Sequence, residues 1–454
     1  MTAPLTAAHV WTCAALFFTL MLRFGLWRLR RRPPPAPPRT WPPIALLRPC
    51  EGAEPDLPLN LLSSLRAHYG GPRRVLFLVP DRADPAYAIA TAVVQTAATQ
   101  GLADAAVVLT APAPRQNRKV AQLVAGLGRC AEEIVVVVDS DVRLGDADLP
   151  ALIAALAADP DSAAAFAAPV EVAPRTLWDR ASAALVGGSP QSFLALYGLH
   201  GLLGGVPSMA GALCALRRPA LARGGGFTGL LTFLGEDYEL ARRFTELGYR
   251  IALSREPARC SDGGRSLAEV VARVARWLTV VRGQRPLLLV TYPVFVAPTP
   301  ILLLAAALWW RSPLWLYVAA LLAARALLCA ALRRAQGLGR GPLAAIGEVL
   351  GAELLLWAGL GRALATRRIR WRGHRFRIGR GGRMLPDDPP PRRAPPPAAS
   401  ATPAASATPA ASATPAASAT PAASATPAAS VTPVEIQPGA PTDDAPRPGH
   451  PLPG

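Results

Sequence analysis

Residues 134–141 read IVVVVDSD, an unbroken β-branched run that ends in two acids separated by one serine. A run without polar alternation is typical of a parallel strand that is covered on both faces. In open α/β sheets, ligands bind just beyond the carboxyl ends of such strands. The stretch therefore predicts a buried strand with Asp139 and Asp141 at the ligand-binding edge of a sheet.

The residues before this strand alternate between strand-like and helical composition. Strands are expected over 75–79 and 105–110, and helices over 86–99 and 117–128. This βαβαβ order predicts a nucleotide-binding half of an open α/β sheet, within an α/β domain over 44–285. Because no GxGxxG follows the first expected strand, a dinucleotide site is not expected.

The composition indicates a membrane protein. The 454 residues are 51% hydrophobic, and the formal net charge is +18. The arginines crowd beside apolar stretches, which favours a membrane surface over nucleic acid as their partner. The six cysteines contain no CxxC pair and the five histidines show no metal-ligand spacing, so neither a disulfide framework nor a zinc site is indicated.

The N-terminal region reads as a membrane anchor over residues 1–32. An apolar stretch over 9–27 is followed directly by arginines at 28 and 30–32. A cleaved signal peptide carries its positive charge before the apolar core, so the anchor is expected to stay, with its arginines on the inner side. The proline-rich stretch 33–43 is expected to be a stiff linker.

Further membrane segments are expected within 286–366. Three apolar stretches, 287–310, 314–332 and 343–365, are each near the length that a bilayer requires. The last one holds Glu348, Glu353 and Arg362, which are costly in hydrocarbon, so either a crossing or an interfacial position is open to it.

The residues after these stretches divide into a basic juxtamembrane segment, 367–385, and a tail, 386–454. Three C-terminal crossings would place the basic segment outside, against the positive-inside tendency. The tail contains a repeated ATPAAS hexapeptide over 401–430 and is expected to be disordered and dispensable for chemistry.

Acidic pairs mark two further candidate sites. Asp81 and Asp84 follow the first expected strand, where a carboxylate can accept a hydrogen bond from a uracil-like base; the alternative is an ordinary turn. Glu236 and Asp237 open an expected helix that runs to about residue 247. One of these carboxylates is a candidate general base, and the alternative is an acid that complements the helix dipole.

For Asp139 and Asp141 the functional interpretation is a divalent cation that bridges a diphosphate, since paired hard oxygens bind such cations. The alternative is a loop that only ends the strand. The chain also contains one lysine, Lys119, among 47 arginines, which indicates a position that needs a compact ammonium, or a survivor by chance.

A helix is expected over 267–281, with Ser266 and Glu269 as a capping box. It places Arg273, Arg276 and Trp277 on one face. This face suits an interfacial helix. Alternatively, arginine contacts a departing pyrophosphate and the tryptophan forms a wall of the acceptor site.

Taken together, the motifs DRADPA (81–86), NRKV (117–120), DSDVR (139–143), GEDYELARRFTELGYRIALS (235–254) and RVARW (273–277) resemble the ceramide glucosyltransferase family. The signature of that family is three separated acidic sites followed by (Q/R)xxRW. The resemblance covers about residues 47–383. It implies a membrane-bound inverting enzyme with a GT-A-type nucleotide-sugar domain, which transfers a single sugar.

The resemblance also implies roles for individual residues. It places Asp81 and Lys119 at donor-binding positions and Asp237 at the position of the base. It places Asp139 and Asp141 at the metal and donor site, with Mg²⁺ or Mn²⁺ as the cofactor. Arg276 and Trp277 complete the set as catalytic residues, and Arg273 opens the same motif.

The expected function is transfer of glucose or N-acetylglucosamine from a UDP-sugar to a lipid hydroxyl, that of ceramide or a similar sphingolipid, at the cytoplasmic face of the inner membrane. The DSD motif is closer to bacterial relatives, some of which resemble hopanoid-glycosylating enzymes, so a hopanoid acceptor is the alternative. A processive polysaccharide synthase is a further alternative, but it would need enough spans to form a channel, and the sequence offers few. A non-enzymatic binder of anionic lipids would leave three acidic sites unused.

Overall fold

The computed structural model describes residues 3–386, except 55, 114, 205–208, 262, 340 and 372–373. These residues belong to one compact unit, Met1–Pro391. The ATPAAS repeats of the expected tail lie outside the described residues.

A seven-stranded sheet forms the centre of the α/β part, in the order β3-β2-β1-β4-β8-β6-β9. Only β8 runs antiparallel to its neighbours in this sheet. The expected α/β class is confirmed. The strands are β1 (Ile44–Pro49), β2 (Arg73–Val79), β3 (Asp104–Leu109), β4 (Ile134–Val138), β6 (Ser162–Phe166), β8 (Leu213–Arg217) and β9 (Arg250–Leu253).

The interior strand β1 corrects the sequence-based expectation, which placed the first strand at 75–79. β1 pairs in parallel with both β2 and β4, so all six of its residues are buried. Its sequence, IALLRP, contains an arginine and a proline, which weakens the strand signal. Arg48 is nevertheless fully buried at the carboxyl end of this strand.

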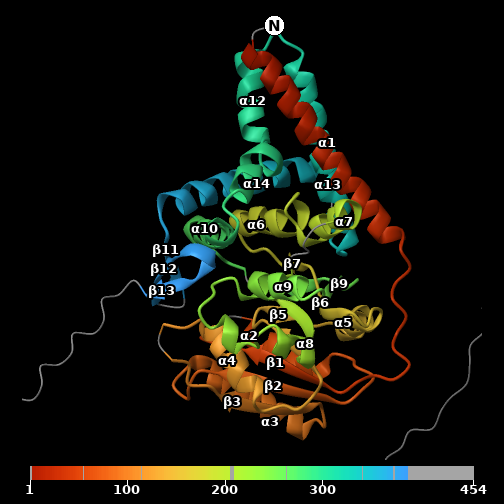
Figure 1. Cartoon of the computed structure of the whole chain (residues 1–454), viewed down its shortest axis with the longest axis vertical. Helices are drawn as coiled ribbons and strands as arrows, with labels where there is room; N and C mark the ends of the chain where they lie inside the picture. The colour runs from red at the N-terminus through yellow and green to blue at the C-terminus, as the bar shows by residue number, and fades with distance from the viewer. Residues whose placement is uncertain are drawn as a thin grey trace, which may run out of the picture. The chain divides into compact units, whose positions relative to one another are not determined.

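Helices cover both faces of the sheet (Figure 1). Ile44 and Leu46 of β1 share a buried cluster with α2, α3 and α5, whereas Leu47 shares another with α4, α8 and α9. The residues of β4 alternate between the same two clusters, which explains why this strand is apolar at every position. The helices are α2 (Leu57–Arg66), α3 (Pro85–Thr99), α4 (Arg118–Leu127), α5 (Asp148–Ala157), α8 (Arg218–Arg223) and α9 (Glu236–Glu246).

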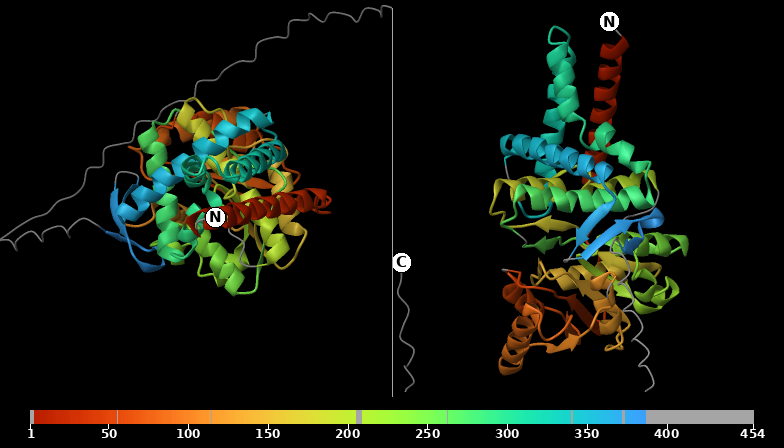
Figure 2. Two further views of the ribbon diagram at one scale, coloured as in Figure 1. Left: turned by 90° about the horizontal axis from the view of Figure 1, so that it is seen from above. Right: turned by 90° about the vertical axis from the view of Figure 1, so that its left-hand side faces the viewer.

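Apolar helices form the other end of the unit. Among the described residues, three helices are long and apolar enough to cross a membrane: α1 (Ala3–Arg31), α13 (Leu314–Ala335) and α14, which starts at Pro342 and ends at Ala365. A bent pair, Leu288–Val296 with α12 (Thr299–Leu308), brings the number to four if it is one span. Figures 1 and 2 show α1 and α12 projecting from the body, while α14 lies crosswise near the base of α12.

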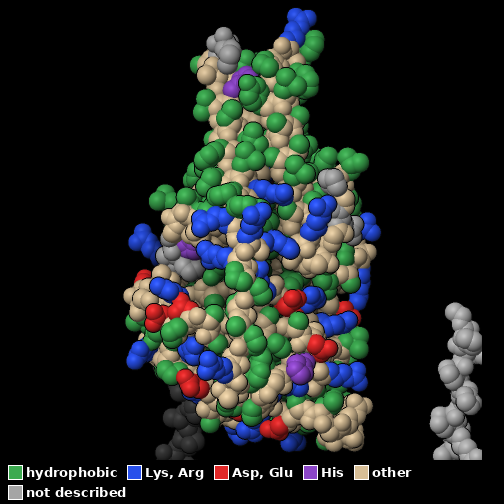
Figure 3. Space-filling view, turned by 90° about the vertical axis from the view of Figure 1, so that its right-hand side faces the viewer, with side chains coloured by type: hydrophobic (Ala, Val, Ile, Leu, Met, Phe, Trp, Pro, Cys, Tyr) green, Lys and Arg blue, Asp and Glu red, His purple; other side chains and the backbone are tan. Residues whose placement is uncertain are grey.

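Below this apolar column, on the face shown in Figure 3, arginines gather in a band above the α/β part. The last turns of α1 and α13 are also rich in arginine: Arg28, Arg30 and Arg31 on α1, and Arg333 and Arg334 on α13. Helices α6 (Leu177–Gly188), α7 (Phe193–Leu203) and α10 (Leu267–Gln284) lie between this end and the sheet.

Side chains complete the hydrogen bonding where the bent pair is broken, by 52°, between Val296 and Thr299. Arg325 of α13 donates to the carbonyls of Phe295 and Val296, and Trp357 of α14 donates to that of Ala297. Glu353 of α14 accepts from the amide of Thr299 and pairs with Arg325. Arg325 and Glu353 therefore neutralise each other's charge, and together they satisfy backbone groups that the break leaves without a helical partner.

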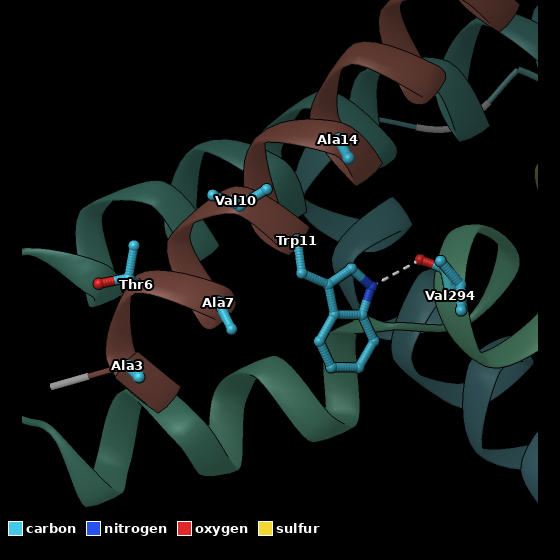
Figure 4. Close-up of a pocket in the computed structure, with 7 residues that line it drawn as sticks. All are labelled: Ala3, Thr6, Ala7, Val10, Trp11, Ala14 and Val294. Atoms are coloured by element: carbon cyan, nitrogen blue, oxygen red, sulfur yellow. Dashed lines mark hydrogen bonds between the residues drawn. The ribbon is translucent and has the colours of Figure 1, made fainter.

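Trp11 of α1 completes this arrangement, since its Nε1 donates to the carbonyl of Val294 at 2.8 Å (Figure 4). The two residues lie at an open apolar groove of about 790 Å³ that runs along the first half of α1. The groove is lined mainly by apolar side chains, which suits contact with lipid chains.

Two small sheets complete the unit. One contains β5 (Val142–Arg143), β10 (Ala258–Cys260) and β7 (Pro169–Glu171). The other is formed by the basic segment for which no element was expected, and contains β11 (Arg368–Trp371), β12 (His374–Ile378) and β13 (Met384–Pro386).

Candidate active site

Lys119 joins two of the acidic sites that the sequence analysis singled out. Its Nζ lies 2.6 Å from Oδ1 of Asp139 and 3.0 Å from Oε1 of Glu236, and the side chain is only 13% exposed. Burial alone would lower the pKa of Lys119, but the two carboxylates raise it well above its ordinary value. A charged lysine therefore links the end of β4 to the start of α9.

Asn117 holds the start of α4, and with it Lys119, against the same part of the chain. Its Oδ1 caps α4 by accepting from the amide of Val120 at 3.2 Å. Its Nδ2 donates to the carbonyl of Phe233 at 2.8 Å and to Oε2 of Glu236 at 3.3 Å. Sequence analysis missed this role, although asparagine directly before a helix is a recognisable capping signal.

Asp237 is fixed by two backbone donors. Its Oδ2 accepts from the amide of Gly211 at 3.0 Å, and its Oδ1 accepts from the amide of Tyr238 at 2.8 Å. Burial, together with the nearby charge of Glu236, raises the pKa of Asp237 to about 6. A carboxylate with such a pKa is suited to proton transfer near neutral pH.

Gly211 occupies the narrow space between Asp237 and Lys119. A Cβ on this residue would lie 3.1 Å from Cβ of Asp237 and 3.4 Å from Nζ of Lys119. Its carbonyl also accepts from Lys119 at 3.3 Å. No local signal in the sequence indicates this glycine, because its role depends on partners that are distant along the chain.

Negative charges lie close together in the Asp139–Asp141 loop. Burial raises the pKa of Asp139 despite Lys119, and the charge of Asp141 raises it further. The carbonyl of Asp141 accepts from the amide of Ser261 at 2.8 Å, which anchors the loop to the small sheet.

Arg48 lies buried beneath this loop and was not singled out from the sequence. It donates to the carbonyls of Ser140 and Val142 and to Oγ of Ser64. Burial lowers the pKa of Arg48 to about 10, against the opposing effect of Asp139 and Asp141. Its positive charge is therefore placed to offset the acids above it.

Asp81 lies on an exposed loop after β2. Its Oδ1 accepts from the amides of Ala83 and Asp84, which is the arrangement of the turn alternative. Asp84 caps α3 by accepting from the amide of Ala86. A contact between Asp81 and a nucleotide base remains a prediction.

The basic face of α10 is present as expected, and the Ser266–Glu269 capping box is confirmed. Arg273 pairs with the buried Glu171 and lies 5.0 Å from the centre of the Trp277 ring. Arg276 and Trp277 are half-buried, and Trp277 packs on the cluster between α10 and α14. The roles expected for these three side chains remain predictions.

A family model described as glycosyl transferase family 21 matches residues 7–384, most of the chain. The chain belongs to glycosyl transferase family 21. This confirms the resemblance to the ceramide glucosyltransferases at the level of the family. Bacterial and hopanoid details of the resemblance remain expectations.

Solved structures show weaker likeness to this member of family 21. A mannosyltransferase from Pyrobaculum calidifontis, in complex with GDP-Man and Mn²⁺, is 19% identical over 79% of this chain and 99% of that chain, with a TM-score of 0.45. A glucosyl-3-phosphoglycerate synthase from Mycobacterium tuberculosis, in complex with Mn²⁺, UDP and glucosyl-3-phosphoglycerate, is 19% identical over 52% of this chain and 79% of that chain, with a TM-score of 0.32.

Proposed function

We propose that this family 21 glycosyltransferase moves one sugar, glucose or N-acetylglucosamine, from a UDP-sugar to the hydroxyl of a membrane lipid. The observation that carries the proposal is the position of Lys119 between Asp139 and Glu236, with Asp237 beside it on Gly211. This arrangement brings the end of β4, where we place the donor, and the candidate base Asp237 into one half-buried polar site. The apolar helices of the same unit supply the route for a lipid.

Asp237 acts as the base in this proposal. Its carboxylate takes the proton of the acceptor hydroxyl while that oxygen forms a bond to the anomeric carbon of the sugar. The bond between the anomeric carbon and the diphosphate breaks in the same step, and UDP leaves with the electron pair. A single displacement of this kind inverts the configuration at the anomeric carbon.

Asp139 and Asp141 fit a divalent cation, Mg²⁺ or Mn²⁺. No group of three or more His, Cys, Asp or Glu among the described residues is placed to hold a metal. Two carboxylates suffice where substrate phosphates complete the shell, as is usual for Mg²⁺. The negative charges of Asp139 and Asp141 repel each other, and a bound cation would relieve this repulsion. When bound, the cation would stabilise the negative charge of the departing diphosphate.

The remaining predicted side chains serve the donor and acceptor. Lys119 would contact a phosphate or the donor sugar, and Asp81 would contact the base. Arg273 and Arg276 would lie on the diphosphate side, and Trp277 would bound the acceptor. These assignments extend the family motif to this chain and await substitution experiments.

The proposed acceptor is ceramide or a similar sphingolipid, with a hopanoid as the alternative. The proposed location is the inner membrane, with the α/β part in the cytoplasm, because arginines flank the apolar helices on the side of the α/β part (Figure 3).

A direct test uses the purified protein in lipid nanodiscs that contain either ceramide or a hopanoid alcohol. Radiolabelled UDP-glucose and UDP-N-acetylglucosamine are supplied separately, and the lipid products are separated by chromatography. Transfer of one sugar to either lipid supports the proposal and identifies the acceptor. Long polymers would show a processive synthase instead, and no transfer to any lipid would refute the proposal.

A further inference from the structure

The C-terminal sheet packs directly on the segment that leads into α9. The amide of Met384 donates to the carbonyl of Thr232 at 2.7 Å, and the amide of Leu234 donates to the carbonyl of Gly382 at 3.4 Å. The guanidinium of Arg383 lies 4.8 Å from the centre of the Phe233 ring, within the range of a cation–π contact. A segment near the end of the described chain thus holds residues 232–234.

The same segment is held on its opposite side by Asn117. The amide of Asn117 donates to the carbonyl of Leu231, and its Nδ2 donates to the carbonyl of Phe233, both at 2.8 Å. Asn117 lies two residues before Lys119. The segment 231–235 is therefore fixed between the start of α4 and the C-terminal sheet, directly before the acids of α9.

Helix α10 closes this packing. A Cβ on Gly235 would lie 2.6 Å from Cγ1 of Val280, and a Cβ on Gly283 would lie 2.9 Å from Cα of Gly382. Both glycines therefore permit close approach. One apolar cluster joins the three parts and contains Leu234, Val280, Ile369, Phe376, Ile378 and Met384.

We propose that the C-terminal sheet is a positioning element of the active site: it fixes segment 231–235 and thereby sets where Glu236 and Asp237 lie relative to Lys119. This inference rests on the proposed role of Asp237 as the base. Because Asp237 follows the clamped segment within three residues, a small movement of the sheet would be passed to its carboxylate. Misplacement of a reacting group by about 1 Å can lower a rate about a hundredfold.

The alternating burial of β12 supports this role over that of a simple basic run. Phe376 and Ile378 are buried, whereas Arg375 and Arg377 are exposed. A segment that served only to contact anionic lipid would need the arginines but not the buried face. Substitutions of single residues in and against this sheet separate the two roles.

The test uses two variants of the full-length protein and a matched control for each. Arg383→Ala removes the contact with Phe233, and its control is Arg377→Ala, an exposed arginine of the same sheet. Gly283→Ala inserts a methyl group against Gly382, and its control is Gly361→Ala, where a Cβ would meet no atom within 4 Å. Arg383→Lys retains a cation and should restore most of the activity that Arg383→Ala loses.

Two quantities are measured for each variant in nanodiscs that contain both ceramide and a hopanoid alcohol: kcat for sugar transfer and the dissociation constant of UDP. We expect kcat to fall about tenfold or more in Arg383→Ala and Gly283→Ala, with UDP affinity within about twofold of wild type and both controls unchanged. Unchanged kcat in both variants would overturn the inference, as would an equal loss of kcat in Arg377→Ala or a parallel loss of UDP affinity. If the wild type itself transfers no sugar, the proposed function fails instead.

Discussion

The ammonium of Lys119 lies 2.6 Å from Oδ1 of Asp139, although the two residues belong to different elements, α4 and the loop after β4. The same ammonium lies 3.0 Å from Glu236 on α9. One cation therefore balances acids from two separate parts of the chain, which would otherwise repel each other in a half-buried site.

Replacing Lys119 tests this balance. Lys119→Met leaves Asp139 and Glu236 without their shared cation, and we expect kcat to fall about a hundredfold or more. Lys119→Arg should fail nearly as badly, because Gly211 leaves no room for a planar fork beside a compact ammonium site. Arg250→Met serves as the control, since Arg250 is exposed and pairs with Asp159. Near-normal turnover in both Lys119 variants would contradict this account of the site.

Asp237→Asn tests the base. The change keeps the size of the side chain but removes proton acceptance, so turnover should fall by roughly a hundredfold or more. UDP affinity should survive, because the proposed partner of Asp237 is the acceptor hydroxyl and not the nucleotide. Glu246→Gln, in the last turn of the same helix, is the matched control. If a folded Asp237→Asn protein turns over normally, Glu236 becomes the next candidate for the base.

The pH dependence of turnover follows from the same residue. Burial and the charge of Glu236 raise the pKa of Asp237 to about 6, and the base must be deprotonated to act. kcat should therefore be constant well above pH 6 and fall about tenfold for each pH unit well below it. A profile measured with saturating substrates that stays flat down to pH 5 would argue against a base with this pKa.

Chelation tests the proposed cation at Asp139 and Asp141. Excess EDTA should stop sugar transfer, and Mg²⁺ or Mn²⁺ should restore it. Asp141→Asn should raise the concentration of cation needed for half-maximal activity. Full activity in excess chelator would show that Asp139 and Asp141 have another purpose.

The ion pair of Arg325 and Glu353 is predicted to stabilise the membrane part. Arg325→Met leaves Glu353 as a buried charge without its partner, which costs about 3–5 kcal/mol in typical proteins. Arg325→Met combined with Glu353→Gln should recover part of this loss, because no charge then remains. Thermal unfolding in detergent, followed by size-exclusion chromatography, measures the difference. Equal melting temperatures for the wild type and Arg325→Met would contradict the prediction.

Local signals in the sequence predicted much of the α/β part. The β-branched run identified β4, and the Ser266–Glu269 box identified the start of α10, because both depend on neighbours within a few residues. β1 was missed, because Arg48 and Pro49 interrupt its apolar pattern and its burial depends on β2 and β4.

The candidate acids and Lys119 were also found from the sequence, but their contacts were not. Lys119 and Glu236 are far apart along the chain, and only tertiary packing brings them together. The fold of the basic segment was missed for a different reason. Its many arginines indicated a membrane surface, and they obscured the alternation that buries Phe376 and Ile378.

The proposed reaction adds one sugar to a membrane lipid, with Asp237 as the base. The most direct measurement compares lipid extracts, by mass spectrometry, from a host without the gene, with the wild-type gene and with the Asp237→Asn variant at equal membrane levels. We predict a lipid whose mass is increased by a single hexose or N-acetylhexosamine, present only with the wild-type gene. Identical lipid profiles in all three hosts, in the presence of ceramide and hopanoid acceptors, would contradict it.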